Sequence, residues 1–230
     1  MSSLALRRFR VVGAVASLRS LAVVMTATLS SCVTGPRPTL EPADTVVPLA
    51  DPAAAAVVDA LATSPTSSFT IEYDIVTNFG GQTTRAVVSV DEILGTSVEI
   101  GDTRYLFTAE GTTSTCSTTT LQCSTGIAET RVSDRQLTST FFKQSPIERI
   151  RQDARVAVGP ATGYEGSADS ERPSVCADFT VVDSQGASRT KTYCALTDYG
   201  VIATMEIADL SVRTVLVEDS VDPARFQPPA

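Results

Sequence analysis

The stretch FTIEYDIV, residues 69–76, decides the fold class of this chain. Apolar and polar residues alternate along it with a period of two. The apolar set is Phe69, Ile71, Tyr73 and Ile75, and the polar set is Thr70, Glu72 and Asp74. Such alternation is typical of a β-strand with one face in a core and the other in water. The sequence therefore predicts a sheet with one buried face and one solvent-exposed face.

Further strands are predicted on the C-terminal side of this one. Gly80-Gly81 supplies a turn into RAVVSV (85–90), the strongest hairpin signal of the chain. In GVIATMEI (200–207), we expect Val201, Ala203, Met205 and Ile207 to share one face. The polar stretch 161–173 is expected to be a loop. The other predicted strands are TSVEI (96–100), RYLFTA (104–109), TSTC (113–116), LQCST (121–125), SVCADFTVV (174–182), RTKTYCAL (189–196) and LSVRTVLVED (210–219).

Two helices are predicted among these strands. The first begins with Asp51 as N-cap and Pro52 at the first helical position, and its apolar stripe is Val57, Val58 and Leu61. The second begins at Ser145-Pro146-Ile147-Glu148, which has the spacing of a capping box. Its apolar residues Ile147, Ile150 and Ala154 recur at helical spacing, and Gly159-Pro160 ends the run.

The expected fold class is therefore α+β, an antiparallel sheet with two or so helices packed on it. The predicted elements fill residues 51–230. A length of about 180 residues is ordinary for one domain with one core.

The first 31 residues have the order of a secretory signal peptide. They contain four arginines and no acid, then an apolar run, then small residues at a cleavage site. Arg19 divides the apolar run into pieces shorter than the roughly 20 residues that a membrane span needs. Arg7-Arg8-Phe9 faintly suggests a twin-arginine export signal. We therefore expect residues 1–31 to be removed on export.

Leu29-Ser30-Ser31-Cys32 resembles the lipobox of bacterial lipoproteins. In that family the cysteine thiol receives a diacylglycerol, and cleavage just before it makes the cysteine the first mature residue. The alternative is an ordinary cysteine beside a plain signal peptide. The resemblance implies that Cys32 carries acyl chains such as palmitate at the extracytoplasmic face of the cell membrane. The proline-rich segment that follows it, within residues 32–50, is expected to be an extended tether.

The charge of the body excludes two kinds of partner. Without the signal peptide, 14 basic residues face 26 acidic ones, a net charge of −12. Nucleic acid would repel such a body, so no nucleic-acid partner is expected. The same charge argues against electrostatic attraction to anionic lipid head groups, so attachment to the membrane is expected to come from the acyl chains.

The four remaining cysteines are expected to form two disulfides, as an even number in an exported chain suggests. Three pairings are possible. We favour Cys116 with Cys123 and Cys176 with Cys194, because each pair flanks a turn-like segment. Cys176 and Cys194 are equidistant from Gln185 near the predicted turn, so a simple hairpin register would place them opposite each other.

The sequence has no recognised catalytic or metal-binding pattern. The chain has no histidine, and its cysteine spacings are not those of a zinc site. Ser188-x-x-Lys191 matches a penicillin-recognising serine motif, but it falls in a predicted strand without a Lys-Thr-Gly partner. We therefore expect no catalytic residues, no metal and no cofactor. Carboxylates that could pair to hydrolyse a glycosidic bond are more simply read as solvated strand edges: Asp178, Asp183, Glu206 and Asp209.

The order of these features resembles actinobacterial lipoproteins of the LolA-like superfamily, which includes the LppX and LprG type. The likeness spans most of residues 51–230 through diffuse motifs. It implies a strongly curved antiparallel sheet, a half-barrel, with helices packed across its concave side. Some members enclose an apolar cavity for acyl chains there. The residues that carry the likeness are 104–123, 174–182 with 191–202, and Val221-Asp222-Pro223 through Phe226 to Pro228-Pro229.

Two functions follow from this resemblance as hypotheses. The first is an anchored envelope lipoprotein that binds or carries an apolar lipid or glycolipid. The second is a non-catalytic interaction or scaffolding lipoprotein whose core is filled. Strand parity alone does not tell which face is concave, so no ligand contacts can be named, and the protein partners stay unknown.

Overall fold

The computed structural model describes residues 49–78, 80–128, 137–167 and 172–229. The predicted signal peptide, Cys32 and most of the predicted tether lie outside these residues. The described body belongs to one compact unit, Val47–Ala230. No helix in the described ranges is long and apolar enough to cross a membrane.

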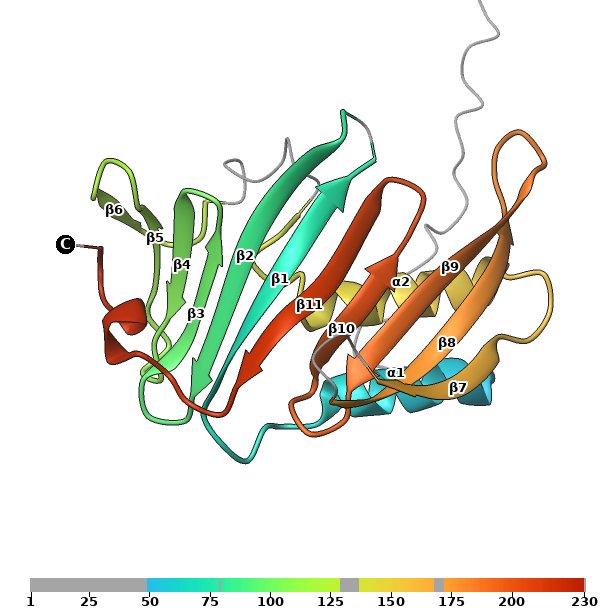
Figure 1. Ribbon diagram of the computed structural model, residues 1–230, viewed down its shortest axis with the longest axis horizontal. Coiled ribbons are helices and arrows are strands. Elements are labelled where there is room, and N and C mark those ends of the chain that lie inside the picture. The colour runs from blue at the N-terminus through green and yellow to red at the C-terminus, as the bar shows by residue number, and fades with distance from the viewer. Residues whose placement is uncertain (1–48, 79, 129–136, 168–171, 230) are drawn as a thin grey trace, which may run out of the picture. The chain divides into compact units, whose positions relative to one another are not determined.

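The body is built on one open antiparallel sheet of eleven strands, in the order β6-β5-β4-β3-β2-β1-β11-β10-β9-β8-β7 (Figure 1). The chain runs outward from the centre to one edge and then returns from the opposite edge, so the first and last strands are neighbours. The strands are β1 (Phe69–Thr77), β2 (Gln82–Asp91), β3 (Gly95–Ile100), β4 (Thr103–Phe107), β5 (Thr113–Ser117), β6 (Cys123–Thr125), β7 (Thr162–Ser167), β8 (Pro173–Val182), β9 (Ser188–Leu196), β10 (Val201–Glu206) and β11 (Leu210–Glu218).

Strand β1 has the two faces that its alternation predicts. Phe69, Ile71, Tyr73 and Ile75 are all fully buried. On the other face, Glu72 and Asp74 are both paired with Arg85 of the neighbouring β2. The predicted turn is also confirmed, because Thr77 pairs with Gln82 and both Gly80 and Gly81 have positive φ.

The two α-helices, α1 (Pro52–Ala62) and α2 (Gln144–Val156), lie on one face of the sheet, behind it in Figure 1. Helix α1 contacts β7, β8, β9, β10 and α2, while α2 also contacts β8. The carboxylate of Asp51 accepts a hydrogen bond from the Ala54 N–H at 2.9 Å, as predicted for the N-cap. Both helices therefore cover the half of the sheet that holds the C-terminal strands.

The predicted capping box of the second helix is wrong. Helix α2 begins at Gln144 after Lys143, without a side-chain cap. The N–H of Ser145 donates to the Thr140 carbonyl, and the Glu148 carboxylate accepts from the Gln144 side chain. The Ser145 N–H and the Glu148 carboxylate, which would bond to each other in a capping box, thus have other partners. The predicted apolar residues still face the core, since Ile147 and Ile150 are buried.

Two other expectations also need correction. Within the stretch 161–173, which was expected to be a loop, residues 162–167 form β7, an edge strand that pairs with β8 through its backbone. In β10, a register shift between Ile202 and Thr204 interrupts the alternation. Val201 therefore lies on the face opposite Met205, although both side chains are buried.

The space between the helices and the sheet is filled by aromatic side chains. Tyr73 of β1 packs edge-on against Phe141 with ring centroids 5.3 Å apart, and Phe179 of β8 packs in the same way against Tyr193 of β9. All four are buried. The Tyr73 hydroxyl donates to the Ile202 carbonyl at 3.0 Å, so its polar end is also satisfied. This region is an ordinary packed core.

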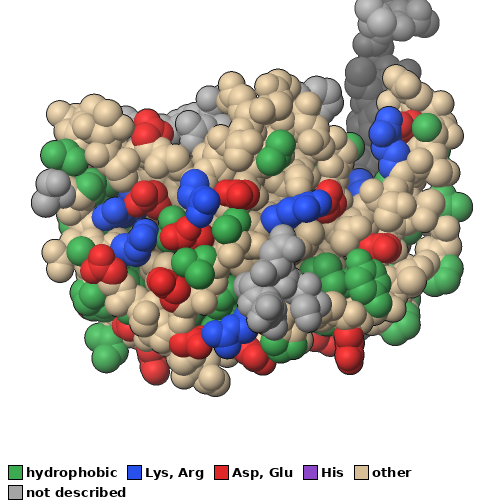
Figure 2. Space-filling view, in the orientation of Figure 1, with side chains coloured by type: hydrophobic (Ala, Val, Ile, Leu, Met, Phe, Trp, Pro, Cys, Tyr) green, Lys and Arg blue, Asp and Glu red, His purple; other side chains and the backbone are tan. Residues whose placement is uncertain are grey.

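Two disulfides join neighbouring strands, and they connect the favoured pairs. Cys116 of β5 is bonded to Cys123 of β6, and Cys176 of β8 to Cys194 of β9. Both pairs lie directly opposite each other in the strand register. Cross-strand partners share a face, and the register places both bridges on the side away from the helices. That side carries intermingled acidic and basic residues (Figure 2).

Candidate functional site

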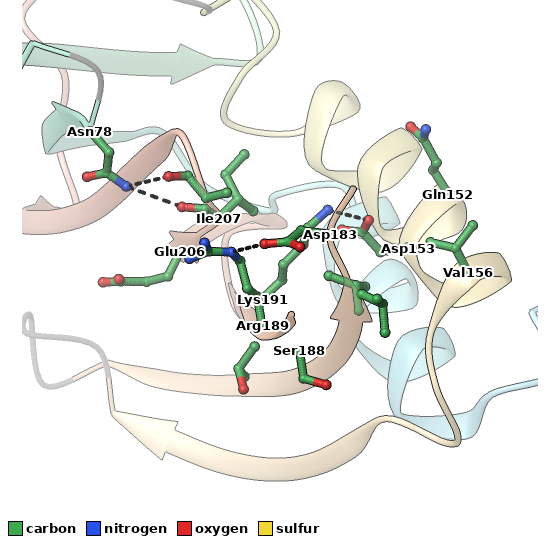
Figure 3. Close-up of a pocket in the computed structure, with 14 residues that line it drawn as sticks. Asn78, Gln152, Asp153, Val156, Asp183, Ser188, Arg189, Lys191, Glu206 and Ile207 are labelled. Atoms are coloured by element: carbon green, nitrogen blue, oxygen red, sulfur yellow. Dashed lines mark hydrogen bonds and ion pairs between the residues drawn. The ribbon is translucent and has the colours of Figure 1, made fainter. Parts of the chain in front are cut away.

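A groove of about 700 Å³ lies at one end of the helix-covered face (Figure 3). Its walls come from the C-terminal part of α2, the β8–β9 hairpin, and the turns that follow β1 and β10. The residues that line it are Asn78, Gln152, Asp153, Val156, Val181, Val182, Asp183, Ser188, Arg189, Thr190, Lys191, Glu206, Ile207 and Ala208.

Asp153 occupies the innermost part of the helix wall. Its side chain is only 6% exposed and accepts two short hydrogen bonds, from Lys191 Nζ and from the Tyr193 hydroxyl, each at 2.6 Å. Burial, and then the bond to Asp153, raises the pKa of Tyr193, which stays a protonated donor. A buried carboxylate needs such partners because desolvation disfavours its charge. The trio fixes α2 on β9.

The hairpin wall is organised around Asp183. Its carboxylate accepts from Arg189 Nε at 2.8 Å and from the backbone N–H groups of Gln185 and Ala187. The hydrogen bond from Arg189 and then these backbone donors lower the pKa of Asp183. Arg189 keeps more than half of its side chain exposed, so it can still offer donors to a ligand.

The opposite wall presents backbone carbonyls and another ion pair. Asn78 Nδ2 donates to the carbonyls of Ile207 and Ala208, which holds the β10–β11 turn beside the β1–β2 turn. Glu206 accepts from Arg213 Nε at 2.7 Å. The side chain of Asn78 therefore holds the β1–β2 turn and the β10–β11 turn together at this wall of the groove.

Apolar side chains stand at the rim of the groove. Val156 of α2 and Val182 of β8 line it, although they are 61% and 50% exposed. Val158 is 62% exposed, and its N–H donates to the carbonyl of Thr180, two residues before Val182. The groove thus offers hydrogen-bonding groups on its walls and apolar surface at its edge. This combination suits an amphiphilic ligand better than a bare acyl chain.

A second, smaller groove of about 300 Å³ is mostly apolar. Phe107 at the end of β4 and Phe142 just before α2 are its aromatic residues, and Thr96, Ser139, Thr140, Lys143 and Gln144 complete its lining. Lys143 Nζ donates to the Thr63 carbonyl at 2.9 Å. Burial lowers the pKa of Lys143.

Four of the residues considered for catalysis line the groove, but the charged ones are held in separate ion pairs: Asp183, Ser188, Lys191 and Glu206. Ser188 and Lys191 lie in β9, a strand rather than a helix start, and Lys191 is held by Asp153. Asp178 accepts from Thr192 at 2.7 Å and is directed to the sheet face opposite the groove. Within the described ranges, no group of three or more His, Cys, Asp or Glu residues could hold a metal ion.

The groove itself was not found by sequence reasoning. One signal was present, because Asp153 follows Ile147 and Ile150 at intervals of three on the buried side of the second helix. A charged residue in an apolar stripe needs a buried partner, and its partners Lys191 and Tyr193 lie far along the chain.

Comparisons with protein-family models and with curated proteins found no match to this chain.

Proposed function

We propose that this chain is a lipoprotein of the cell envelope that binds a lipid or glycolipid. In this proposal, acyl chains on Cys32 hold the protein at the extracytoplasmic face of the cell membrane. The ligand enters the groove beside α2 with its polar head group. The observation that carries the proposal is the groove, which joins polar walls to an apolar rim at one mouth.

The chemistry of the walls suggests the class of head group. Arg189 and Ser188 offer donors from the hairpin, while Glu206 and the carbonyls of the β10–β11 turn offer acceptors. Hydroxyl groups of a sugar or polyol both donate and accept, so they can use both walls at once. The acyl chains of such a ligand would lie along the valines of the rim instead of entering the packed core.

We also propose that the sheet is curved into the half-barrel of LolA-like lipoproteins. The antiparallel order of eleven strands, the two open edges and the placement of both helices on one face support this architecture. The groove would then lie at one end of the concave side, between the sheet and α2.

Lipid co-purification tests the proposal. A Cys32→Ala chain, exported and purified in soluble form, would be extracted with organic solvent for mass spectrometry. Ala208→Trp places a large side chain in the groove at an exposed turn position. Ala109→Trp makes the same change at an exposed turn outside both grooves. We expect a lipid or glycolipid with the parent and with Ala109→Trp, and its loss with Ala208→Trp.

Equal lipid content in the two tryptophan variants would place the ligand elsewhere. No enriched lipid in the parent chain would reject lipid binding.

The second candidate, an interaction or scaffolding lipoprotein with a filled core, is favoured by one observation. Phe141, Phe179 and Tyr73 close the space between helices and sheet. For this candidate, crosslinking in whole cells would capture a protein or wall-polymer partner while extracts stay free of lipid.

A further inference from the structure

Three exposed valines gather where α2 ends and the β8–β9 hairpin begins. Val156 and Val182 line the same groove, and Val158 is bonded to β8 beside them. Each exposes at least half of its surface. Because water disfavours exposed apolar surface, exposed apolar residues that lie near one another mark binding surfaces more often than isolated ones do.

Helix α2 and the tip of the β8–β9 hairpin are more basic than the protein as a whole. Helix α2 and the segment from Asp183 to Lys191 together contain five basic and three acidic residues, whereas the whole chain has a net charge of −8. Two of the acids, Asp153 and Asp183, are held in ion pairs within the groove. Arg155 is exposed in the last turn of α2, beside Val156. The valine cluster is thus flanked by local positive charge.

The described chain also begins beside this cluster. The carboxylate of Asp51 accepts from the Ala161 N–H at 2.7 Å, which fixes the start of the body three residues from Val158. A segment from Cys32 to Leu49 can span at most about 60 Å, at about 3.5 Å per residue. An anchor at Cys32 would therefore leave this end of the body within reach of the membrane surface.

We propose that Val156, Val158 and Val182, flanked by Arg155 and Arg189, form a surface that docks on the anionic lipid head groups of the anchoring membrane. We call these five residues the docking rim. The valines would enter the interface, and the arginines would contact phosphates. The proposal deepens the proposed function, because the mouth of the groove would then face the bilayer. A lipid head group could enter while its acyl chains stay in the membrane.

Vesicle binding tests the docking rim without the anchor or any groove ligand. The mature chain with Cys32→Ser would be sedimented with vesicles of phosphatidylglycerol and phosphatidylcholine, and with vesicles of phosphatidylcholine alone. We expect binding to the anionic vesicles that weakens as salt is raised, because screening shortens the reach of the arginines. The failure of this parent chain to bind anionic vesicles would overturn the proposal.

Matched variants distinguish binding by the docking rim from non-specific adsorption to the vesicles. V156T/V158T/V182T keeps the β-branched shape but adds hydroxyls, while I93T/V215T/L216T changes three exposed apolar residues outside the rim. R155Q/R189Q removes rim charge, and R85Q/R213Q removes charge from the opposite face of the sheet. We expect each rim variant to bind about tenfold more weakly or worse, and each control to bind like the parent.

Equal binding by rim and control variants would also overturn the proposal. Unfolding midpoints of all variants would confirm that the folded state is retained. These vesicles contain no glycolipid, so their result does not depend on the groove being occupied. Lipid co-purification can therefore fail while vesicle binding succeeds, and the reverse is equally distinguishable.

Discussion

Lys191 Nζ lies 2.6 Å from Asp153 Oδ1, and this ion pair connects the middle of β9 to the last turns of α2. The same carboxylate accepts from the Tyr193 hydroxyl, so its two oxygens have different partners. The contact decides where α2 lies on the sheet. It also neutralises the charge of Asp153 at the wall of the groove.

Removal of the buried partner is expected to destabilise the body strongly. Asp153→Ala leaves Lys191 and Tyr193 without their acceptor, and breaking a buried pair costs about 3–5 kcal/mol. Lys191 retains 26% exposure, which places the expected loss in the free energy of unfolding near the lower end. Urea unfolding would measure it. As a control, Glu206→Ala removes the acid of the exposed pair with Arg213 and should cost about 1 kcal/mol or less. Similar losses for both variants would contradict this assignment.

The two disulfides are expected to differ in their contribution to stability. Cys176–Cys194 closes a separation of 18 residues, and Cys116–Cys123 a separation of 7. In the chain-entropy description, the longer loop corresponds to about 3 kcal/mol and the shorter to about 2 kcal/mol. Urea unfolding of C176A/C194A and C116A/C123A would compare them. A larger loss from the second variant would show that strand packing, and not loop length, controls the difference.

The stability supplied by Asp51 should disappear in acid. Burial raises the pKa of this carboxyl, but the N–H groups of Ala54, Ala161 and Ala53 outweigh it and lower the pKa below the ordinary 3.8. A lowered folded-state pKa gives stability that is fully present above about pH 3.8 and lost as the pH falls through the folded value. The difference in unfolding free energy between the parent and Asp51→Asn should therefore shrink from pH 6 to pH 3. A difference that stays constant over this pH range would contradict the assignment.

Gly200 is expected to resist substitution. Its φ is +63°, and an added Cβ would lie 2.1 Å from the Thr63 carbonyl oxygen at the end of α1. Gly186 also has positive φ, but an added Cβ there meets nothing within 4 Å. Gly186→Ala should therefore lose only about 1 kcal/mol, the usual backbone cost, whereas Gly200→Ala should lose more because helix and turn must separate. Thermal unfolding of the two variants would decide, and equal midpoints would refute the close approach.

Anchoring at Cys32 can be tested in cells. Cys32→Ala removes the thiol that would carry the acyl chains, so the protein should appear in the medium or keep its signal peptide. Fractionation and the mass of the mature N-terminus would show either result. Membrane retention equal to that of the parent would rule out acylation as the anchor.

The sequence predicted elements best where a single face is buried. Alternation in β1 identified the core face, and symmetry about Gln185 identified the register that joins Cys176 to Cys194. Strand β7 was not predicted because its sequence, TGYEGS, has two glycines and no apolar alternation. Its order comes from backbone pairing with β8, and Gly163 admits α1, since an added Cβ would lie 2.9 Å from the Cβ of Ala53.

The groove was not predicted from the sequence for a different reason. Its walls combine side chains from four places along the chain, such as Asn78, Asp153, Arg189 and Ala208. Their convergence follows from the strand order, in which β1 and β11 meet at the centre of the sheet. Local patterns describe one element at a time, so they do not reveal which turns will stand side by side.

The central pairing of β1 with β11 also governs when the body can form. Thr70 is aligned with Glu218, so the middle seam of the sheet requires almost the entire length of the chain. Contacts between such distant segments form slowly, because a long loop must close first. Until its last strand emerges, the nascent polypeptide cannot complete its core. The pairing of β1 with β11 is therefore among the last steps in the formation of the sheet.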